Sequence, residues 1–121
     1  MKALIKQFNV KNEYYTSEKC FITELSNSTD DPDLSIAQAR VEAGVTTCWH
    51  RVQNTVERYY ILSGEGLMEL GDTAPQPVRS GDVVIIPPLC KQRITNTGNS
   101  DLVFLAICSP RFLQNNYQEI E

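Results

Sequence analysis

Short apolar runs alternate along the chain with clusters of glycine, proline, asparagine and aspartate. The runs are rich in Val, Ile, Tyr and Phe, which favour strands over helices. Turn-forming clusters, such as NSTDDPD at 27–33 and SGEG at 63–66, separate them. The pattern predicts strands over 3–8, 19–25, 35–42, 56–62, 66–70, 82–87, 91–96 and 102–108. We therefore expect an all-β protein, an antiparallel sandwich or barrel, with the jelly roll among the candidates.

The length of 121 residues fits one domain with one hydrophobic core. No stretch has convincing helical periodicity, and there is neither an internal repeat nor a low-complexity segment. Residues 1–121 are therefore expected to form a single domain. Its C-terminal segment, 109–121, leaves the last predicted strand at Pro110 and is expected to pack over the surface or on a partner subunit.

Composition and charge exclude several classes of partner. The chain is 41% apolar and has no apolar run near the ~20 residues that a membrane-spanning helix needs, so no membrane association is expected. A formal charge of -4 and scattered basic residues argue against nucleic acid. The start, MKALIKQFNV, lacks an export signal, which predicts a cytoplasmic protein.

The candidate chemistry centres on the only histidine, His50, and on Glu57 seven positions later. Residues two apart on a strand point the same way, so an inward Glu57 implies an inward Tyr59. The same alternation places Cys48 on the face of His50, and Cys90 on the face of Gln92. A few polar groups among apolar side chains are typical of a small-molecule pocket.

Two segments resemble the paired motifs of the cupin superfamily. The first motif reads G, five residues, H-x-H, three or four residues, E, six residues, G. Segment 44–64 has this spacing, with Gly44, His50, Glu57 and Gly64 in place and Val52 at the second histidine. The second motif reads G, five residues, P-x-G, two residues, H, three residues, N. Segment 81–96 matches at Gly81, Pro87 and Asn96, with Leu89 for the inner glycine and Gln92 for the histidine.

This resemblance implies a small single-domain cupin, a double-stranded β-helix (jelly-roll) barrel of two antiparallel sheets. Metal-binding cupins use three histidines and a glutamate, whereas this chain keeps His50, Glu57 and the substitute Gln92. The resemblance therefore implies a weak site for a divalent metal (Zn, Mn, Fe or Ni). Two alternatives remain open. In the first, a thiolate of Cys48 or Cys90, or water molecules, complete the metal site. In the second, the pocket is free of metal, and His50 and Glu57 form a hydrogen bond with each other.

The main functional hypothesis is a small-molecule-binding barrel. Tyr59, Gln92, Arg40 and Arg93 are the candidate substrate contacts. One alternative is a metal-dependent oxygenase, isomerase or lyase in which Glu57 or Tyr59 moves a proton, so whether the chain is an enzyme stays open. Another is a structural or interaction dimer whose inner face is closed.

A homodimer is also expected. The apolar segment 3–8 and the outward residues Trp49, Tyr60 and Leu62 would otherwise leave an apolar patch and free strand edges exposed.

Overall fold

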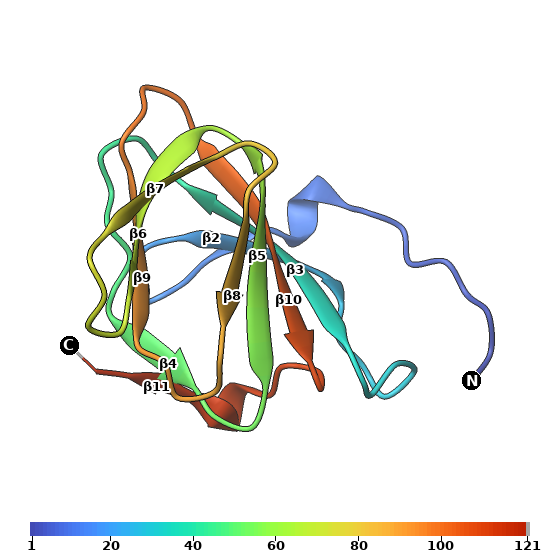
Figure 1. Cartoon of the computed structure of the whole chain (residues 1–121). Helices are drawn as coiled ribbons and strands as arrows, with labels where there is room; N and C mark the ends of the chain where they lie inside the picture. Colours follow the sequence, from blue (N-terminus) through green and yellow to red (C-terminus); the bar gives the residue numbers. More distant parts are fainter. Residues whose placement is uncertain (121) are drawn as a thin grey trace.

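The computed structural model describes residues 1–120; Glu121, the last residue of the segment 109–121, lies outside the described residues. The chain folds into two antiparallel sheets that face each other across the core (Figure 1). The strands are β1 (Tyr14–Tyr15), β2 (Phe21–Ser26), β3 (Ser35–Val41), β4 (His50–Val52), β5 (Val56–Ser63), β6 (Glu65–Leu70), β7 (Gln76–Arg79), β8 (Val83–Ile86), β9 (Gln92–Asn96), β10 (Leu102–Ser109) and β11 (Tyr117–Glu119). Two short 3₁₀ helices, η1 (Val10–Asn12) and η2 (Gln114–Asn116), complete the described elements.

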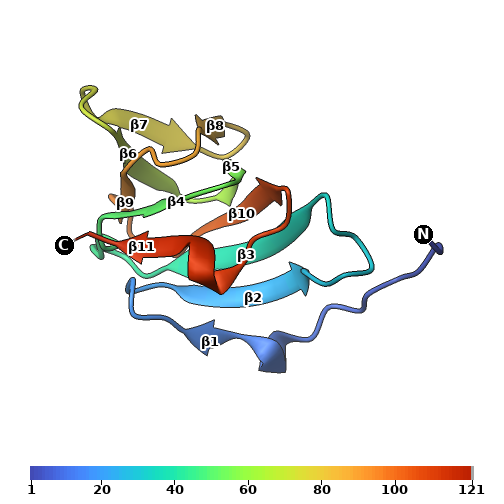
Figure 2. The ribbon, with the colours of Figure 1, turned by 90° about the horizontal axis from the view of Figure 1, so that it is seen from below.

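The larger sheet has six strands in the order β1-β2-β3-β10-β5-β8, and the smaller sheet has five in the order β11-β4-β9-β6-β7. Figure 2 shows β11 lying across the opening between the two sheets, beside β4 and above β2 and β3. The order mixes strands that are far apart in sequence, as jelly rolls do. The expected all-β fold of two antiparallel sheets is confirmed.

The core forms because strand alternation turns one apolar face of each sheet inward. Ile61 of β5, Ile94 of β9 and Leu102 of β10 are fully buried there. Phe104 packs its ring against Tyr59 with ring centroids 4.3 Å apart. Tyr59 thus belongs to the core through its ring, while its hydroxyl remains available for polar contacts.

Four motif positions, Gly44, Gly64, Gly81 and Leu89, adopt the left-handed backbone conformation that favours glycine. Gly64 has a φ of +87°, and a Cβ there would lie 2.7 Å from the backbone oxygen of Asp101. Only glycine fits this turn between β5 and β6. Leu89 stands where the second cupin motif has glycine, and it keeps a φ of +67°. The backbone of the motif has therefore been retained although its glycine has been replaced.

The strand predicted over 3–8 is wrong. These residues form no strand, and Ile5 is 84% exposed. Apolar composition favours a strand, but a strand also needs a neighbour for its backbone hydrogen bonds. In Figure 1 this segment runs away from both sheets. The other predicted strands are present within two residues of their expected ends.

The C-terminal segment adds an edge strand to the smaller sheet. β11 pairs antiparallel with β4, with Tyr117 opposite Val52 and Glu119 opposite His50. This pairing places the C-terminal strand directly beside the histidine. Both helices in residues 1–120 are single three-residue turns, and neither is long or apolar enough to cross a membrane.

Candidate functional site

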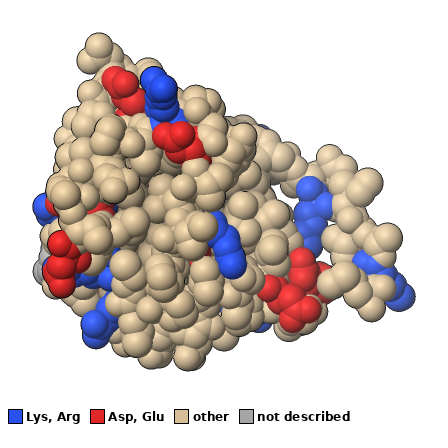
Figure 3. All heavy atoms as spheres, viewed as in Figure 1, with Lys and Arg blue, Asp and Glu red and all other residues tan. Residues whose placement is uncertain are grey.

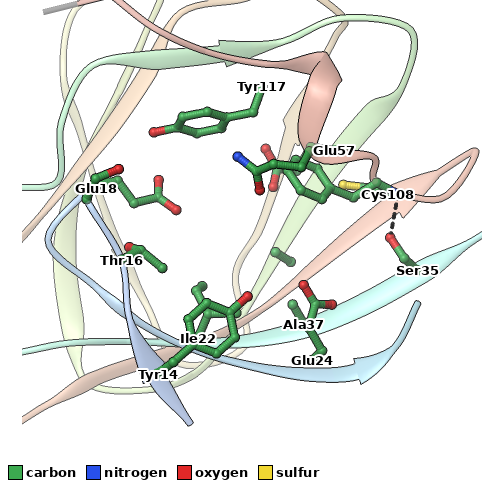
Figure 4. Close-up of a pocket in the computed structure, with 14 residues that line it drawn as sticks. Tyr14, Thr16, Glu18, Ile22, Glu24, Ser35, Ala37, Glu57, Cys108 and Tyr117 are labelled. Atoms are coloured by element: carbon green, nitrogen blue, oxygen red, sulfur yellow. Dashed lines mark hydrogen bonds between the residues drawn. The ribbon is translucent and has the colours of Figure 1, made fainter. Parts of the chain in front are cut away.

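Two adjoining chambers lie between the sheets. The larger has a cavity volume of about 130 Å³ and the smaller about 60 Å³. They share part of their lining: Glu18, Ile22, Glu57, Ala106, Phe112 and Tyr117. Figure 4 shows Tyr117 and Tyr14 on opposite sides of the larger chamber, with the carboxylates of Glu18, Glu24 and Glu57 around it. The site is therefore a cavity with polar groups directed into it, and its lining includes the exposed residues Tyr14 and Glu24.

His50, at the start of β4, lines the smaller chamber and is buried. Its Nδ1 lies 3.0 Å from the backbone oxygen of Cys48 and 3.4 Å from Oε2 of Glu18. Because a carbonyl oxygen can only accept a hydrogen bond, Nδ1 carries a hydrogen and donates it to the carbonyl of Cys48. The ring stacks on that of Tyr117, with centroids 5.3 Å apart. These contacts fix the orientation of the imidazole.

A hydrogen-bonded chain joins three further predicted site residues, Tyr59, Gln92 and Glu57. The hydroxyl of Tyr59 donates to Oε1 of Gln92 at 2.5 Å, and Nε2 of Gln92 donates to Oε1 of Glu57 at 2.8 Å. All three residues are buried. The neutral amide thus satisfies a phenol and a carboxyl group at once, as burial of polar groups requires.

Burial also changes the pKa values of the ionisable groups in this hydrogen-bonded chain. Desolvation raises the pKa of Glu57 above its ordinary value, although the positive charge available at His50 and the hydrogen bond from Gln92 oppose the shift. Burial, reinforced by the nearby Glu57, raises the pKa of Tyr59 well above the usual range. Tyr59 is therefore a permanent hydrogen-bond donor, whereas Glu57 has an increased tendency to hold its proton.

Several lining residues come from outside the two motifs and were missed by the sequence reasoning. Glu18 precedes β2, Glu24 lies on β2, and Tyr117 lies on β11. Residues two apart on a strand share a face, and Cys20 is buried, so the sequence contained a signal that Ile22 and Glu24 lie on the same side as Cys20. No signal pointed to Tyr117, because its position depends on the docking of β11 onto β4.

Arg40 and Arg93 do not line either chamber. Arg40 pairs with Glu13 at 2.8 Å and Asp101 at 3.3 Å, and lies over the ring of Phe21. Arg93 pairs with Glu69 at 2.6 Å and lies over Trp49. Each alternates with inward neighbours and thus projects from the opposite face of its strand. The structure brings together His50, Glu57, Tyr59 and Gln92, but not these two arginines.

The thiols that line the chambers are Cys20 and Cys108 rather than Cys48 or Cys90. Sγ of Cys48 lies 3.6 Å from the backbone oxygen of Ser17, and Cys90 lines a separate surface hollow. Burial raises the pKa of the Cys108 thiol to about 12, which keeps this sulfur protonated and a poor metal ligand.

The predicted metal ligands His50, Glu57 and Gln92 lie close together, but the side chain of Gln92 is not free to coordinate a metal ion. The only oxygen of the Gln92 side chain accepts from Tyr59, and its amide nitrogen faces Glu57. Turning the amide over would place its oxygen against the carboxyl group of Glu57. Within residues 1–120, no group of three His, Cys, Asp or Glu side chains is arranged to hold a metal ion. The residues therefore do not fit a metal without breaking the hydrogen-bonded chain.

Comparison with known proteins agrees with this architecture. The family model described as the cupin domain matches residues 38–108. An uncharacterized protein of Methanocaldococcus jannaschii is 32% identical over 123 residues, covering 100% of this chain and 98% of its own. The oxalate-binding protein of Thermotoga maritima is 35% identical over 71 residues, covering 59% of this chain and 58% of its own length.

Among solved structures, an uncharacterized conserved protein of Klebsiella pneumoniae with a double-stranded β-helix domain superposes with a TM-score of 0.78. The match covers 96% of this chain and 97% of that one at 15% identity, so it concerns the fold alone. The two sheets, the retained motif backbone and the family match over 38–108 together show that the chain belongs to the cupin family.

Proposed function

We propose that the protein binds a small organic molecule in the two chambers between its sheets. The observation that carries this proposal is the hydroxyl of Tyr117. Its oxygen is buried and has no hydrogen-bond partner within residues 1–120, and Tyr117 lines both chambers. An unsatisfied buried hydroxyl costs about 1–3 kcal/mol, which a bound ligand would offset. The likeness to an oxalate-binding protein is consistent with binding of a small molecule.

The same chambers argue against a purely structural role with a closed inner face. A barrel kept only for its surface would fill the space with apolar side chains. Instead, Glu57 and His50 are held there, although burial of ionisable groups is costly.

Proton-transfer chemistry is the second candidate function, because Glu57 is buried, has a raised pKa and faces a cavity. These are the properties of a general acid or base. In this role Glu57 would exchange a proton with the ligand, and Gln92 would hold the carboxyl group in position.

Filling the space tests the main proposal. Ala106 lines both chambers, and Ala106→Leu is expected to reduce their volume without adding charge. We expect NMR titration with oxalate, ethylene glycol and n-butylammonium to shift the amide signals of Glu18, Glu57 and Tyr117 for at least one compound. The variant should then lose at least tenfold in affinity, and the matched variant Ala3→Leu, on the exposed N-terminal segment, should not. The proposal would be contradicted if no compound shifted these signals in the parent protein, or if Ala106→Leu bound the compound as tightly as the parent protein does.

We also propose that the protein forms a homodimer through the outer surface around β8. This edge strand presents Val83 at 61% exposure and Ile85 at 64%, next to Tyr60 and Leu62 of β5. An apolar edge strand pairs readily with another chain. Light scattering at micromolar concentration is expected to give twice the chain mass, and Ile85→Lys should give a monomer. A monomeric parent protein would refute the dimer without affecting the ligand site.

A further inference from the structure

We infer that the ligand of the chambers is a small organic cation, such as an ammonium group on a short carbon chain. This inference rests on the proposed function and names its ligand class. It follows from the charges, the aromatic rings and the unsatisfied hydroxyl that the chambers contain.

The lining carries acidic groups without matching basic side chains. Glu18, Glu24 and Glu57 all line the larger chamber. Within residues 1–120, no lysine or arginine lines either chamber, and His50 is the one basic side chain there. The Nδ1 hydrogen of His50 is already directed to the carbonyl of Cys48 and toward Glu18. The electrostatic potential in this space is therefore negative, which favours a cation.

Aromatic rings provide the second feature that suits a cation. Tyr14, Phe112 and Tyr117 line the larger chamber with the carboxylates. Figure 4 places the rings of Tyr14 and Tyr117 on two sides of the space that Glu18, Glu24 and Glu57 surround. A cation is attracted to the face of an aromatic ring, less strongly at Tyr14, which is 48% exposed, than at the part-buried ring of Tyr117.

The unpartnered hydroxyl of Tyr117 points to a ligand independently of the acidic groups. Its oxygen can accept a hydrogen bond from an N–H group. An ammonium carries three such donors and no acceptor, so it can serve the hydroxyl and two carboxylates at once. These requirements match a primary ammonium on a short carbon chain, which places its apolar part against Ile22, Ala37 and Ala106.

Other ligand classes fit less well. A dicarboxylate such as oxalate would face Glu18, Glu24 and Glu57 at close range, and only a bound metal ion could offset that repulsion. The hydrogen bonds within the Gln92 chain oppose such a metal ion. A neutral alcohol could reach the Tyr117 hydroxyl but would leave the carboxylates uncompensated.

The test compares n-butylammonium, 1-butanol and oxalate by NMR titration of the full chain at pH 8 and constant ionic strength. We expect n-butylammonium to shift the signals of Glu18, Glu57 and Tyr117 and to bind at least tenfold more tightly than 1-butanol. Glu18→Gln and Glu57→Gln should each weaken its binding about tenfold, which corresponds to about 1.4 kcal/mol. Glu42→Gln, at an exposed position outside both chambers, should leave the affinity unchanged.

The outcomes separate the ligand class from the binding site. Binding of oxalate or 1-butanol in the chambers as tightly as n-butylammonium would overturn the cation inference and leave the proposed function standing. Shifts from n-butylammonium that survive both glutamine substitutions would also overturn it. If no compound perturbs the chamber signals of the parent protein, both the inference and the proposed function fail.

Discussion

Replacing Val52 and Gln92 together by histidine is expected to turn the barrel into a tight metal-binding protein. Val52 is 5% exposed and lines the smaller chamber with His50 and Glu57. Gln92 is 1% exposed and directly opposes His50 in the pairing of β4 with β9. Val52→His with Gln92→His would supply three imidazoles and a carboxylate at the positions that the cupin motifs use. We expect the dissociation constant for Zn²⁺ or Ni²⁺ to fall at least 1,000-fold, about 4 kcal/mol, by calorimetry.

Two further variants check that the gain arises at this site. Val52→His alone should give a smaller gain, because Gln92 would still be engaged with Tyr59 and Glu57. His50→Ala in the doubly substituted protein should abolish tight binding. Elemental analysis of the parent protein should find less than one metal ion per chain. A full complement of metal there would contradict our account of the Gln92 side chain and restore the weak site predicted from His50, Glu57 and Gln92.

Gln92→Leu is expected to lower the free energy of unfolding by about 3–4 kcal/mol. Leucine fills a similar space but leaves the hydroxyl of Tyr59 and the carboxyl group of Glu57 without their shared buried partner. Urea unfolding at pH 7 measures the change.

Tyr59→Phe should cost less, about 1 kcal/mol, because it removes one donor and leaves the bond between Gln92 and Glu57 intact. Gln38→Leu, on the half-exposed outer side of β3, should change stability by less than about 0.5 kcal/mol. If the Gln92→Leu protein were as stable as the Gln38→Leu protein, the hydrogen bonds that link Tyr59, Gln92 and Glu57 would have no structural role.

The sequence predicted best those features that depend on local alternation. His50, Glu57, Tyr59 and Gln92 were placed on one interior face by parity and motif spacing, and they do meet there. The same parity, applied to Arg93, would have placed it outside, because its neighbour Gln92 points inward. The guanidinium groups of Arg40 and Arg93 have the chemistry to bind an anion, but their positions on the strands place them outside both chambers.

Features that depend on long-range docking could not be predicted. Glu18 and Tyr117 meet at His50 although they are almost a hundred positions apart in sequence. Nothing local to either residue specifies that meeting. The segment 3–8 illustrates the opposite error, since its apolar pattern suits a strand while no neighbouring strand pairs with it.

The position of β11 has a consequence for how quickly a ligand can enter and leave. This three-residue strand is held at the sheet edge by pairing with β4 alone, yet it carries Tyr117, which lines both chambers. Short edge elements open locally at a small fraction of the free energy of global unfolding. Exchange of a buried ligand is therefore expected to follow detachment of the C-terminal strand, so that residence time and affinity can be altered separately by changing how firmly β11 is attached.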